Sequence, residues 1–94
     1  MSVATSRSMS AATSRRECRK AAEALGVFVG GVYHHYKGGI YTVEGIGWDT
    51  EAQAISVRYC SQMYPDSPEY YRLLSVFAGS NERGEPRFVR SILD

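Results

Sequence analysis

The spacing of apolar positions changes once along the chain, from a helical repeat to the alternation typical of strands. Small apolar residues first recur at intervals of three and four positions: Cys18, Ala21, Ala22 and Leu25. This spacing places them on one face of a helix, which we expect to run over about residues 15–25. Because these side chains are mostly small, the face can pack closely against another surface.

Both ends of this helix carry sequence signals. Ser14 is followed three positions later by Glu17, the capping-box spacing in which a hydroxyl and a carboxylate satisfy free backbone N–H groups. Gly26 stands where a left-handed C-cap residue is needed. We therefore expect an amphipathic helical segment over residues 14–26. The basic, Ser/Arg-rich residues 1–13 before it are predicted to form a disordered tail.

Residues 40–48 show the clearest alternation of apolar and polar positions, which predicts a strand. In a regular strand Tyr41 and Val43 lie on one face. The opposite face then carries Ile40, Ile46 and Trp48. A polar connection of hairpin length over residues 49–53 leads to a second alternating strand over residues 55–60.

Shorter elements complete the pattern, with turn residues between them. They are, in chain order, an apolar β segment at 27–29, a loop at 64–68 with two prolines, a strand at 70–73, a helical turn ending at Phe77, a turn at 79–84 and an edge strand at 86–92. Four or five short strands favour a mostly β (α+β) fold. We predict a small SH3-like β-barrel or roll over residues 27–94, preceded by one N-terminal helix.

The composition is that of one small globular domain with many tyrosines. Hydrophobic residues make up 44% and charged residues 22% of the 94 positions, and seven residues are tyrosine. A tyrosine buries its ring while keeping a polar tip near water, so this residue suits half-buried binding surfaces. A chain this short buries a small core, and we therefore expect it to form homo-oligomers that bury more surface.

The net charge of +1 is unevenly distributed. Residues 1–26 hold five basic and two acidic residues, whereas the remainder holds six basic and eight acidic ones. A basic head on a mildly acidic body indicates electrostatic steering of a partner, although the same charges are typical of a solvated helix face. The chain has no signal-peptide pattern and no long apolar stretch. We expect a cytoplasmic protein of a bacterial host cell, with reduced cysteines and no membrane partner.

Several spaced motifs resemble a known family. Its opening motif is an aromatic residue, any residue, histidine, an aromatic residue, lysine and glycine, with tyrosine and valine on the strand that follows. The residues that match this motif are Tyr33, His35, Tyr36, Lys37, Gly38, Tyr41 and Val43. Those similar to its closing motifs are Arg72, Leu74, Phe77, Pro86, Arg87 and Phe88. From residue 31 to about residue 90 the chain thus resembles the small bacterial and phage family called domain of unknown function sixteen fifty-three. The resemblance implies a fold and no particular reaction.

Three cations lie within these motifs, each next to an aromatic residue: Lys37, Arg72 and Arg87. Arginine holds phosphate or carboxylate with a planar fork, and aromatic rings supply stacking surfaces. We predict a ligand-binding site made of Tyr33, His35, Tyr36, Lys37, Tyr41, Arg72, Arg87 and Phe88. The alternative is that Lys37 and Arg87 cap loops and pair with carboxylates such as Glu85.

The sequence shows no catalytic or metal-binding constellation. The candidate zinc ligands, His34, His35, Cys18 and Cys60, lack any metal-ligand spacing. No residue near Cys60 plainly orients a base, and no phosphate-binding glycine loop is present. We predict that the protein is not an enzyme and uses neither a metal nor a cofactor.

Two classes of function remain. The first is a non-catalytic binding protein for a small anionic, nucleotide-like ligand. Because the family has phage members and the chain is small, such a binding protein could be a phage-encoded sponge that sequesters a host defence signal. The alternative is a protein- or nucleic-acid-binding adaptor that uses the barrel groove and the basic helix. An enzyme that uses His35 or Cys60 has less support than either.

Overall fold

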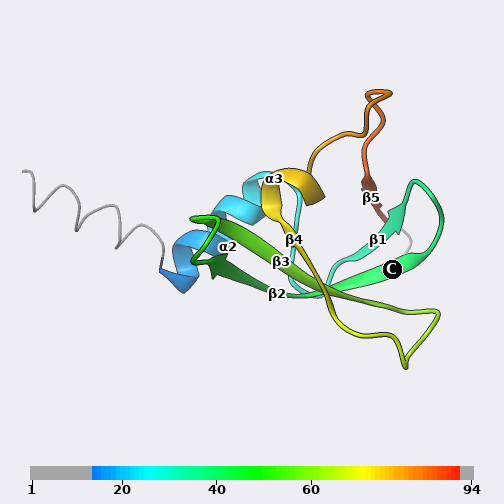
Figure 1. Ribbon diagram of the computed structural model, residues 1–94, viewed down its shortest axis with the longest axis horizontal. Helices are drawn as coiled ribbons and strands as arrows, with labels where there is room; N and C mark the ends of the chain where they lie inside the picture. The colour runs from blue at the N-terminus through cyan, green and yellow to red at the C-terminus, as the bar shows by residue number, and fades with distance from the viewer. Residues whose placement is uncertain (1–13, 92–94) are drawn as a thin grey trace, which may run out of the picture.

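The computed structural model of the protein describes residues 14–91, and the tail predicted over residues 1–13 lies outside them. Within these residues four strands follow the first helix, and a short second helix leads to a fifth strand (Figure 1). They are α2 (Arg15–Ala24), β1 (Val32–His35), β2 (Ile40–Asp49), β3 (Ala54–Ser61), β4 (Tyr70–Leu73), α3 (Leu74–Phe77) and β5 (Phe88–Arg90). The prediction of a strand over residues 70–73 followed by a helical turn to Phe77 is confirmed.

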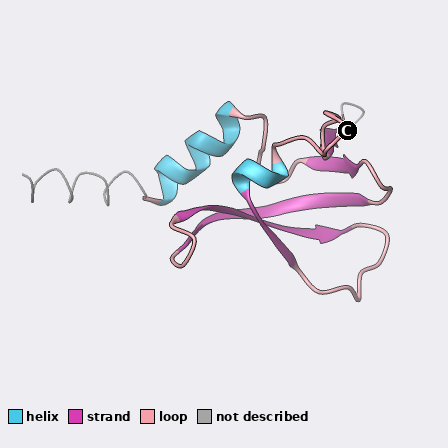
Figure 2. Cartoon of the chain, turned by 45° about the horizontal axis from the view of Figure 1, so that its top comes forward, coloured by secondary structure: helices cyan, strands magenta, loops and turns pink. Residues whose placement is uncertain are grey.

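The five strands form one antiparallel sheet in the order β4-β3-β2-β1-β5. β4 and β5 are its edges, and within residues 14–91 they do not pair with each other. The predicted mostly β fold with an N-terminal helix is therefore confirmed, whereas the sheet stays open and is not a closed barrel. Both helices lie on the same side of the sheet (Figures 1 and 2), so its two faces have different surroundings.

Helix α2 begins and ends where the capping signals predict. The Ser14 hydroxyl accepts a hydrogen bond from the N–H of Glu17. At the other end Gly26 has a φ of +82°, and the N–H of Val27 donates to the carbonyl of Ala22, the pattern of a Schellman cap. The apolar face is narrower than the sequence predicts: Cys18 and Ala22 are buried, but Ala21 and Leu25 are exposed.

A β-bulge in β2 corrects the predicted faces of that strand. The pairing with β3 shifts between Val43 and Gly45, so one extra residue enters β2. Val43 then pairs with Tyr59, and Ile46 pairs with Val57. Directly paired residues share a face. Ile46 and the residue two positions beyond it, Trp48, therefore lie on the same inner face as Val43, not on the opposite one.

The apolar segment at residues 27–29 is a loop and not a strand, because a buried tyrosine hydroxyl organises its backbone. Tyr33 Oη donates to the carbonyl of Gly26 at 2.8 Å and accepts from the N–H of Phe28 at 2.9 Å. The Val27 side chain still enters the core. Tyr33 thus satisfies backbone groups that a strand would otherwise pair with a neighbour.

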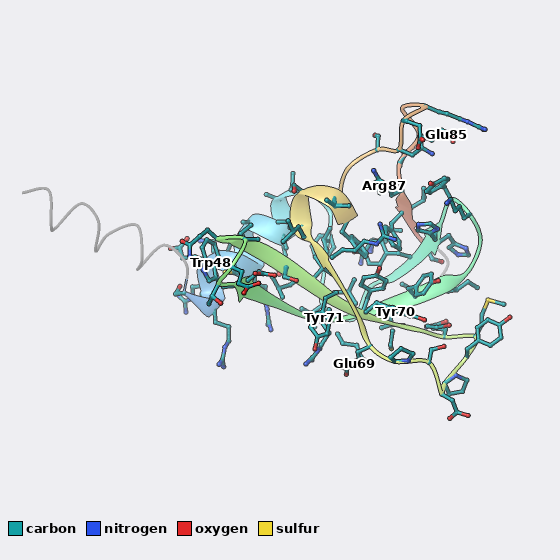
Figure 3. All side chains as sticks on the ribbon, in the orientation of Figure 1. Trp48, Glu69, Tyr70, Tyr71, Glu85 and Arg87 are labelled. Atoms are coloured by element: carbon teal, nitrogen blue, oxygen red, sulfur yellow. The ribbon has the colours of Figure 1, made fainter. Side chains whose placement is uncertain are left out.

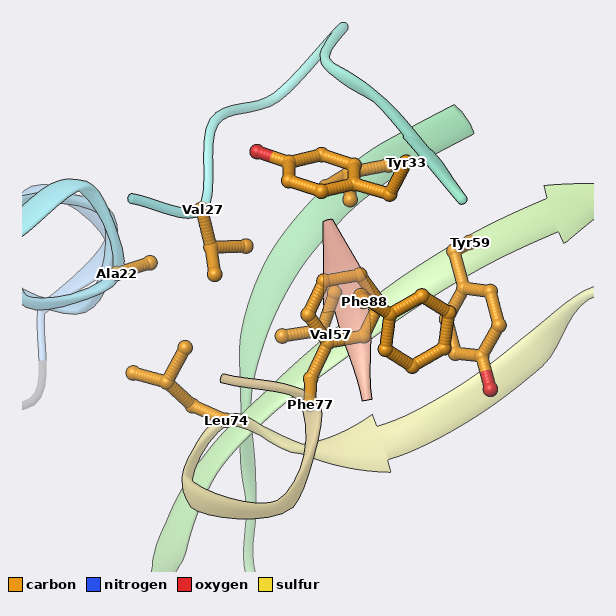
Figure 4. Close-up of a cluster of buried hydrophobic side chains, with 9 residues drawn as sticks. Ala22, Val27, Tyr33, Val57, Tyr59, Leu74, Phe77 and Phe88 are labelled. Atoms are coloured by element: carbon orange, nitrogen blue, oxygen red, sulfur yellow. The ribbon is translucent and has the colours of Figure 1, made fainter. Parts of the chain in front are cut away.

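The core lies between the helices and part of the inner sheet face (Figure 4). It consists of Ala22, Val27, Tyr33, Val43, Val57, Tyr59, Leu74, Phe77 and Phe88. Phe77 of α3 stacks on Phe88 of β5, with ring centroids 4.0 Å apart and an interplanar angle of 8°. The helices cover only part of the inner face, and the ends of the strands beyond them are uncovered (Figure 2).

Candidate functional site

A hollow of about 190 Å³ lies on the uncovered part of the inner face. Every strand of the sheet contributes to its lining, which consists of His35 (β1), Tyr41 (β2), Tyr59 (β3), Tyr70 and Arg72 (β4) and Phe88 (β5). The strand register explains this convergence, because Tyr59 pairs with Tyr70 and His35 pairs with Phe88. We call it the aromatic hollow.

The rings of the aromatic hollow pack mainly edge to face. Tyr41 stands at 82° to Tyr59 with centroids 5.5 Å apart, and at 79° to Phe88 with centroids 6.0 Å apart. Edge-to-face contacts are attractive and fix the orientation of each ring. Tyr59 and Phe88 are also part of the core, so the walls of the hollow are held from behind.

Arg72 brings a positive charge into this aromatic environment. Its Nε donates a 2.8 Å hydrogen bond to the Tyr59 hydroxyl, and its guanidinium carbon lies 5.7 Å from the centre of the Phe88 ring. No carboxylate of residues 14–91 forms an ion pair with it. The charge of Arg72 is therefore positioned by a tyrosine and left uncompensated.

Arg87 and Lys37 add to this charge. The Nε of Arg87 is buried and has no hydrogen-bond partner among residues 14–91. Glu85, its predicted alternative partner, accepts a hydrogen bond from Asn81 at 3.0 Å (Figure 3). The Nζ of Lys37 lies 5.7 Å from the ring centre of Tyr36. The loop-capping ion pair with Glu85 is thus not formed, and a buried donor without an acceptor remains next to the site.

The imidazole of His35 is influenced by the charges of all three cations. Its Nδ1 accepts a 3.2 Å hydrogen bond from the N–H of Lys37, so the neutral ring carries its proton on Nε2. Burial lowers the pKa of His35 below its usual value, and the charges of Arg72, Lys37 and Arg87 lower the pKa further. All three predicted cations therefore act on one imidazole. Their positive potential would favour an anion at this place.

This arrangement predicts how His35 titrates. In a His34→Gln variant, which leaves one imidazole, we expect the NMR titration midpoint of His35 to lie below about 6.5. Arg72→Gln should move this midpoint upward, because the strongest neighbouring charge is removed. Since the folded protein binds the proton less readily than the unfolded chain, the free energy of unfolding should decline as pH falls from about 6.5. A midpoint at or above 6.5 would contradict this geometry.

The structure brings most of the predicted site residues together. Four of them line the aromatic hollow: His35, Tyr41, Arg72 and Phe88. Three more surround His35: Tyr36, whose ring centre is 4.7 Å away, and the charges of Lys37 and Arg87. Tyr33 does not join them, because its ring is in the core and its hydroxyl holds the loop at residues 26–28.

Two lining residues were missing from the predicted site, Tyr59 and Tyr70. Tyr59 alternates with polar residues in β3 and was recognisable as an inward-facing ring. Tyr70 comes directly before Tyr71, and sequence alone does not show which of the two faces inward. The register answers this, because Tyr70 pairs with the inward-facing Tyr59.

A known protein family matches the part of the chain that forms the hollow. The family described as "Protein of unknown function (DUF1653)" matches residues 31–90. The chain belongs to the DUF1653 family. A crystal structure of a DUF1653 protein from Bordetella bronchiseptica is 31% identical and covers 69% of this chain and 88% of its own, with a TM-score of 0.54. No curated protein matches the chain.

The DUF1653 match includes all five strands and leaves helix α2 outside it. The aromatic hollow is thus built entirely from the DUF1653 portion. Among residues 14–91, no group of three or more metal-ligating side chains lies close together. In the same part of the chain, no helix is long and apolar enough to cross a membrane.

Proposed function

We propose that the aromatic hollow binds a small anionic ligand that carries a planar ring, without converting it. The observation that supports this most directly is the position of Arg72 in the aromatic lining, without a carboxylate partner in residues 14–91. The positive charges of Lys37 and Arg87 act on His35 of the same lining. Proteins rarely leave a buried donor such as the Nε of Arg87 without an acceptor. Because this Nε is buried, an oxyanion of the ligand would approach the other nitrogens of the Arg87 guanidinium.

The size of the hollow limits which part of a ligand enters. Its volume of about 190 Å³ is below the roughly 300–1,000 Å³ typical of sites that enclose a drug-sized molecule. Because the rings of Tyr41, Tyr70 and Phe88 already contact one another, one planar ring of the ligand would lie against them on the open side of the hollow. The rest of a nucleotide-like ligand then lies at the rim, where the charges of Lys37 and Arg87 favour phosphate.

The cations also select against a different class of ligand. Cages of several aromatic rings commonly bind quaternary ammonium groups through the negative faces of the rings. Here Arg72 already lies over Phe88, and two further positive charges act on the same place. A cationic ligand would be repelled, so the charge of the site favours an anion.

Two observations support binding without catalysis. Cys60 follows the inward-facing Tyr59 and therefore points to the outer face of the sheet, away from His35. Its Sγ donates a hydrogen bond to a carboxylate oxygen of Glu44 at 3.1 Å, and this bond is the largest cause that raises the pKa of the thiol. A protonated thiol on the wrong face does not pair with His35 as a nucleophile. A sponge that sequesters a signalling nucleotide is one role for such a protein.

A thermal-shift panel tests the proposal. The full chain is mixed with mononucleotides, the matching nucleosides, inorganic phosphate and choline. Mononucleotides should raise the melting temperature through binding to the folded state, nucleosides should raise it less, and choline should not raise it. The mononucleotide should be recovered unchanged. Stabilisation by choline, or by no anion in the panel, would contradict the proposal.

We also propose that two copies associate through a sheet edge. β4 and β5 are edges with unpaired backbone groups, which readily accept another strand. The small-residue face of α2 is not the contact, because Cys18 and Ala22 pack inside the protein. Light scattering of the purified chain should therefore give a dimer mass or a larger closed assembly. A constant monomer mass up to millimolar concentration would rule this out.

A further inference from the structure

A second and larger concavity lies outside the aromatic hollow. It has a volume of about 500 Å³, and its lining consists of Arg15, Gly45, Ile46, Gly47, Trp48, Asp49, Ser56, Arg58 and Tyr71. Two rows of paired residues on the outer face of the sheet form its floor: Gly45 with Arg58 and Tyr71, and Gly47 with Ser56. Because the side chains at three of these positions are small or missing, the floor is largely backbone. At the end of β2 the lining also includes the inner-face residues Ile46 and Trp48 and reaches Arg15 of α2. We call this feature the outer trough.

Arg58 lies across the floor of the outer trough. Its Nη2 donates to the carbonyl of Glu44 at 3.3 Å, and its Nε is buried without a partner among residues 14–91. A Cβ atom at Gly45 would come within 3.1 Å of the same guanidinium. The glycine thus leaves space for the arginine to lie flat on the sheet, with a donor that has no acceptor.

Tyr71 supplies an aromatic surface at one end of the trough. It is 65% exposed, whereas its neighbour Tyr70 lines the aromatic hollow on the other face. Both tyrosines are marked in Figure 3. An exposed ring next to a cation is suited to stacking with a nucleic-acid base. Because the adjacent residues Tyr70 and Tyr71 lie on opposite faces, the aromatic hollow and the outer trough are separated by the thickness of the sheet.

The opposite end of the trough continues onto helix α2. Arg15 lines the trough and also a neighbouring concavity of about 410 Å³, together with Arg16, Arg19, Lys20 and Glu23. The four basic side chains are exposed and recur at spacings that place them on one helix face. We call them the basic stripe.

We propose that the outer trough and the basic stripe together bind single-stranded nucleic acid. The bases stack on Tyr71, and the phosphates follow Arg58 and Arg15 onto the stripe. A mononucleotide would leave most of this surface unused, because the cations continue beyond the trough along a full helical turn. An acidic peptide finds charge here, but it makes no use of the stacking surface. A duplex keeps its bases stacked inside and offers none to Tyr71.

The acidic residues near this surface do not cancel its charge at the trough. Asp49 Oδ1 accepts hydrogen bonds from the N–H groups of Glu51 and Ala52, so this carboxylate is engaged in the β2–β3 turn. Glu44 accepts the hydrogen bond of Cys60, and Glu23 lies at the far end of the stripe. Asp49 and Glu23 are part of the lining, but the five cations outnumber these two acids: Arg15, Arg16, Arg19, Lys20 and Arg58.

Fluorescence anisotropy with a labelled oligothymidine of about 12 nucleotides tests the proposal on the full chain. The logarithm of the binding constant should fall with the logarithm of the salt concentration, with a slope of about −0.7 for each phosphate contact. Tyr71→Ala should weaken binding about five-fold or more. The matched control is Tyr64→Ala, which removes a loop tyrosine of equal exposure (66%) outside the trough and should change nothing.

A charge-reversal pair tests the basic stripe. Arg19→Glu should weaken binding and make the salt slope shallower, whereas Arg83→Glu, an equal charge change in the distant turn at residues 81–84, should leave the slope as it is. Arg72→Ala and an excess of mononucleotide should have no effect, which separates this surface from the aromatic hollow. The proposal is overturned if Tyr71→Ala matches Tyr64→Ala, if the salt slope is near zero, or if polyglutamate or a duplex of the same length binds equally well.

Discussion

Arg72→Ala should weaken the binding of a mononucleotide to the aromatic hollow by about 2–5 kcal/mol, the usual cost of removing one partner from a charge pair that becomes buried in the complex. The guanidinium is held by Tyr59 through its Nε, lies over Phe88, and has no carboxylate partner in residues 14–91. Its charge is therefore free to meet the phosphate. Isothermal titration calorimetry with the mononucleotide that most stabilises the wild type measures the loss.

Three variants distinguish how much of the affinity depends on the charge of Arg72 and how much on the shape and position of its guanidinium. Arg72→Lys keeps the charge but loses the planar fork and the hydrogen bond to Tyr59, so it should recover only part of the affinity. Tyr59→Phe keeps the arginine and removes only its hydroxyl partner, with an intermediate loss. Arg83→Ala removes an arginine far from the hollow and should bind as the wild type does. If Arg72→Ala binds as tightly as Arg83→Ala, the hollow is not the site.

Arg87→Ala should also reduce the affinity for the mononucleotide. The losses of binding free energy caused by Arg72→Ala and Arg87→Ala should not be additive. Both charges act on His35 and would meet the same anion. Both variants should remain folded, because neither guanidinium is fully buried and removing Arg72 leaves one unsatisfied tyrosine hydroxyl at a cost of about 1 kcal/mol. Far-UV circular dichroism checks this. An unfolded arginine variant would mean that the cation is structural.

The local elements were predictable because their signals are short-range. The Ser14 cap, the left-handed Gly26 and the helical turn ending at Phe77 each depend on a few neighbouring residues. The open sheet was not predictable in the same way. Whether β4 and β5 meet depends on the twist and pairing of all five strands, and no single segment encodes it.

The β-bulge shows why the faces of β2 could not be read from alternation alone. One extra residue between Val43 and Gly45 reverses the alternation for the rest of the strand. This reversal keeps Ile46 on the core side, where it packs against the buried cluster. A bulge depends on which residue of β3 each position meets, so the sequence of β2 by itself does not reveal it.

The candidate site was predictable where cations and aromatic residues share a short sequence motif. It was less predictable where residues far apart in sequence are brought together by the strand order. His35, Tyr36 and Lys37 are neighbours in sequence, and their contacts follow from one turn. Arg72 and Phe88 join them only through the strand order. Tyr33 belongs to the same motif, yet its contribution is to the core, because its hydroxyl satisfies a loop.

Phe77→Ala should lower the free energy of unfolding by about 3–5 kcal/mol, the cost of emptying a buried phenylalanine site. Phe77 is 1% exposed, stacks on Phe88, and packs edge to face against Tyr33 and Tyr59. Its removal therefore leaves a cavity at the centre of the core (Figure 4). A loss of this size is a large part of the 5–15 kcal/mol that stabilises a typical small protein.

Urea unfolding measures this loss, and thermal unfolding should show a melting temperature lower by more than about 10 °C. Phe28→Ala is the matched control: it removes the same atoms from a half-exposed ring that lies beneath Arg90, and should cost much less. Because Phe88 lines the aromatic hollow while it rests on Phe77, the milder Phe77→Leu should stay folded and still weaken ligand binding. Equal losses for Phe77→Ala and Phe28→Ala would show that α3 does not hold the core, and that the hollow has no support from behind.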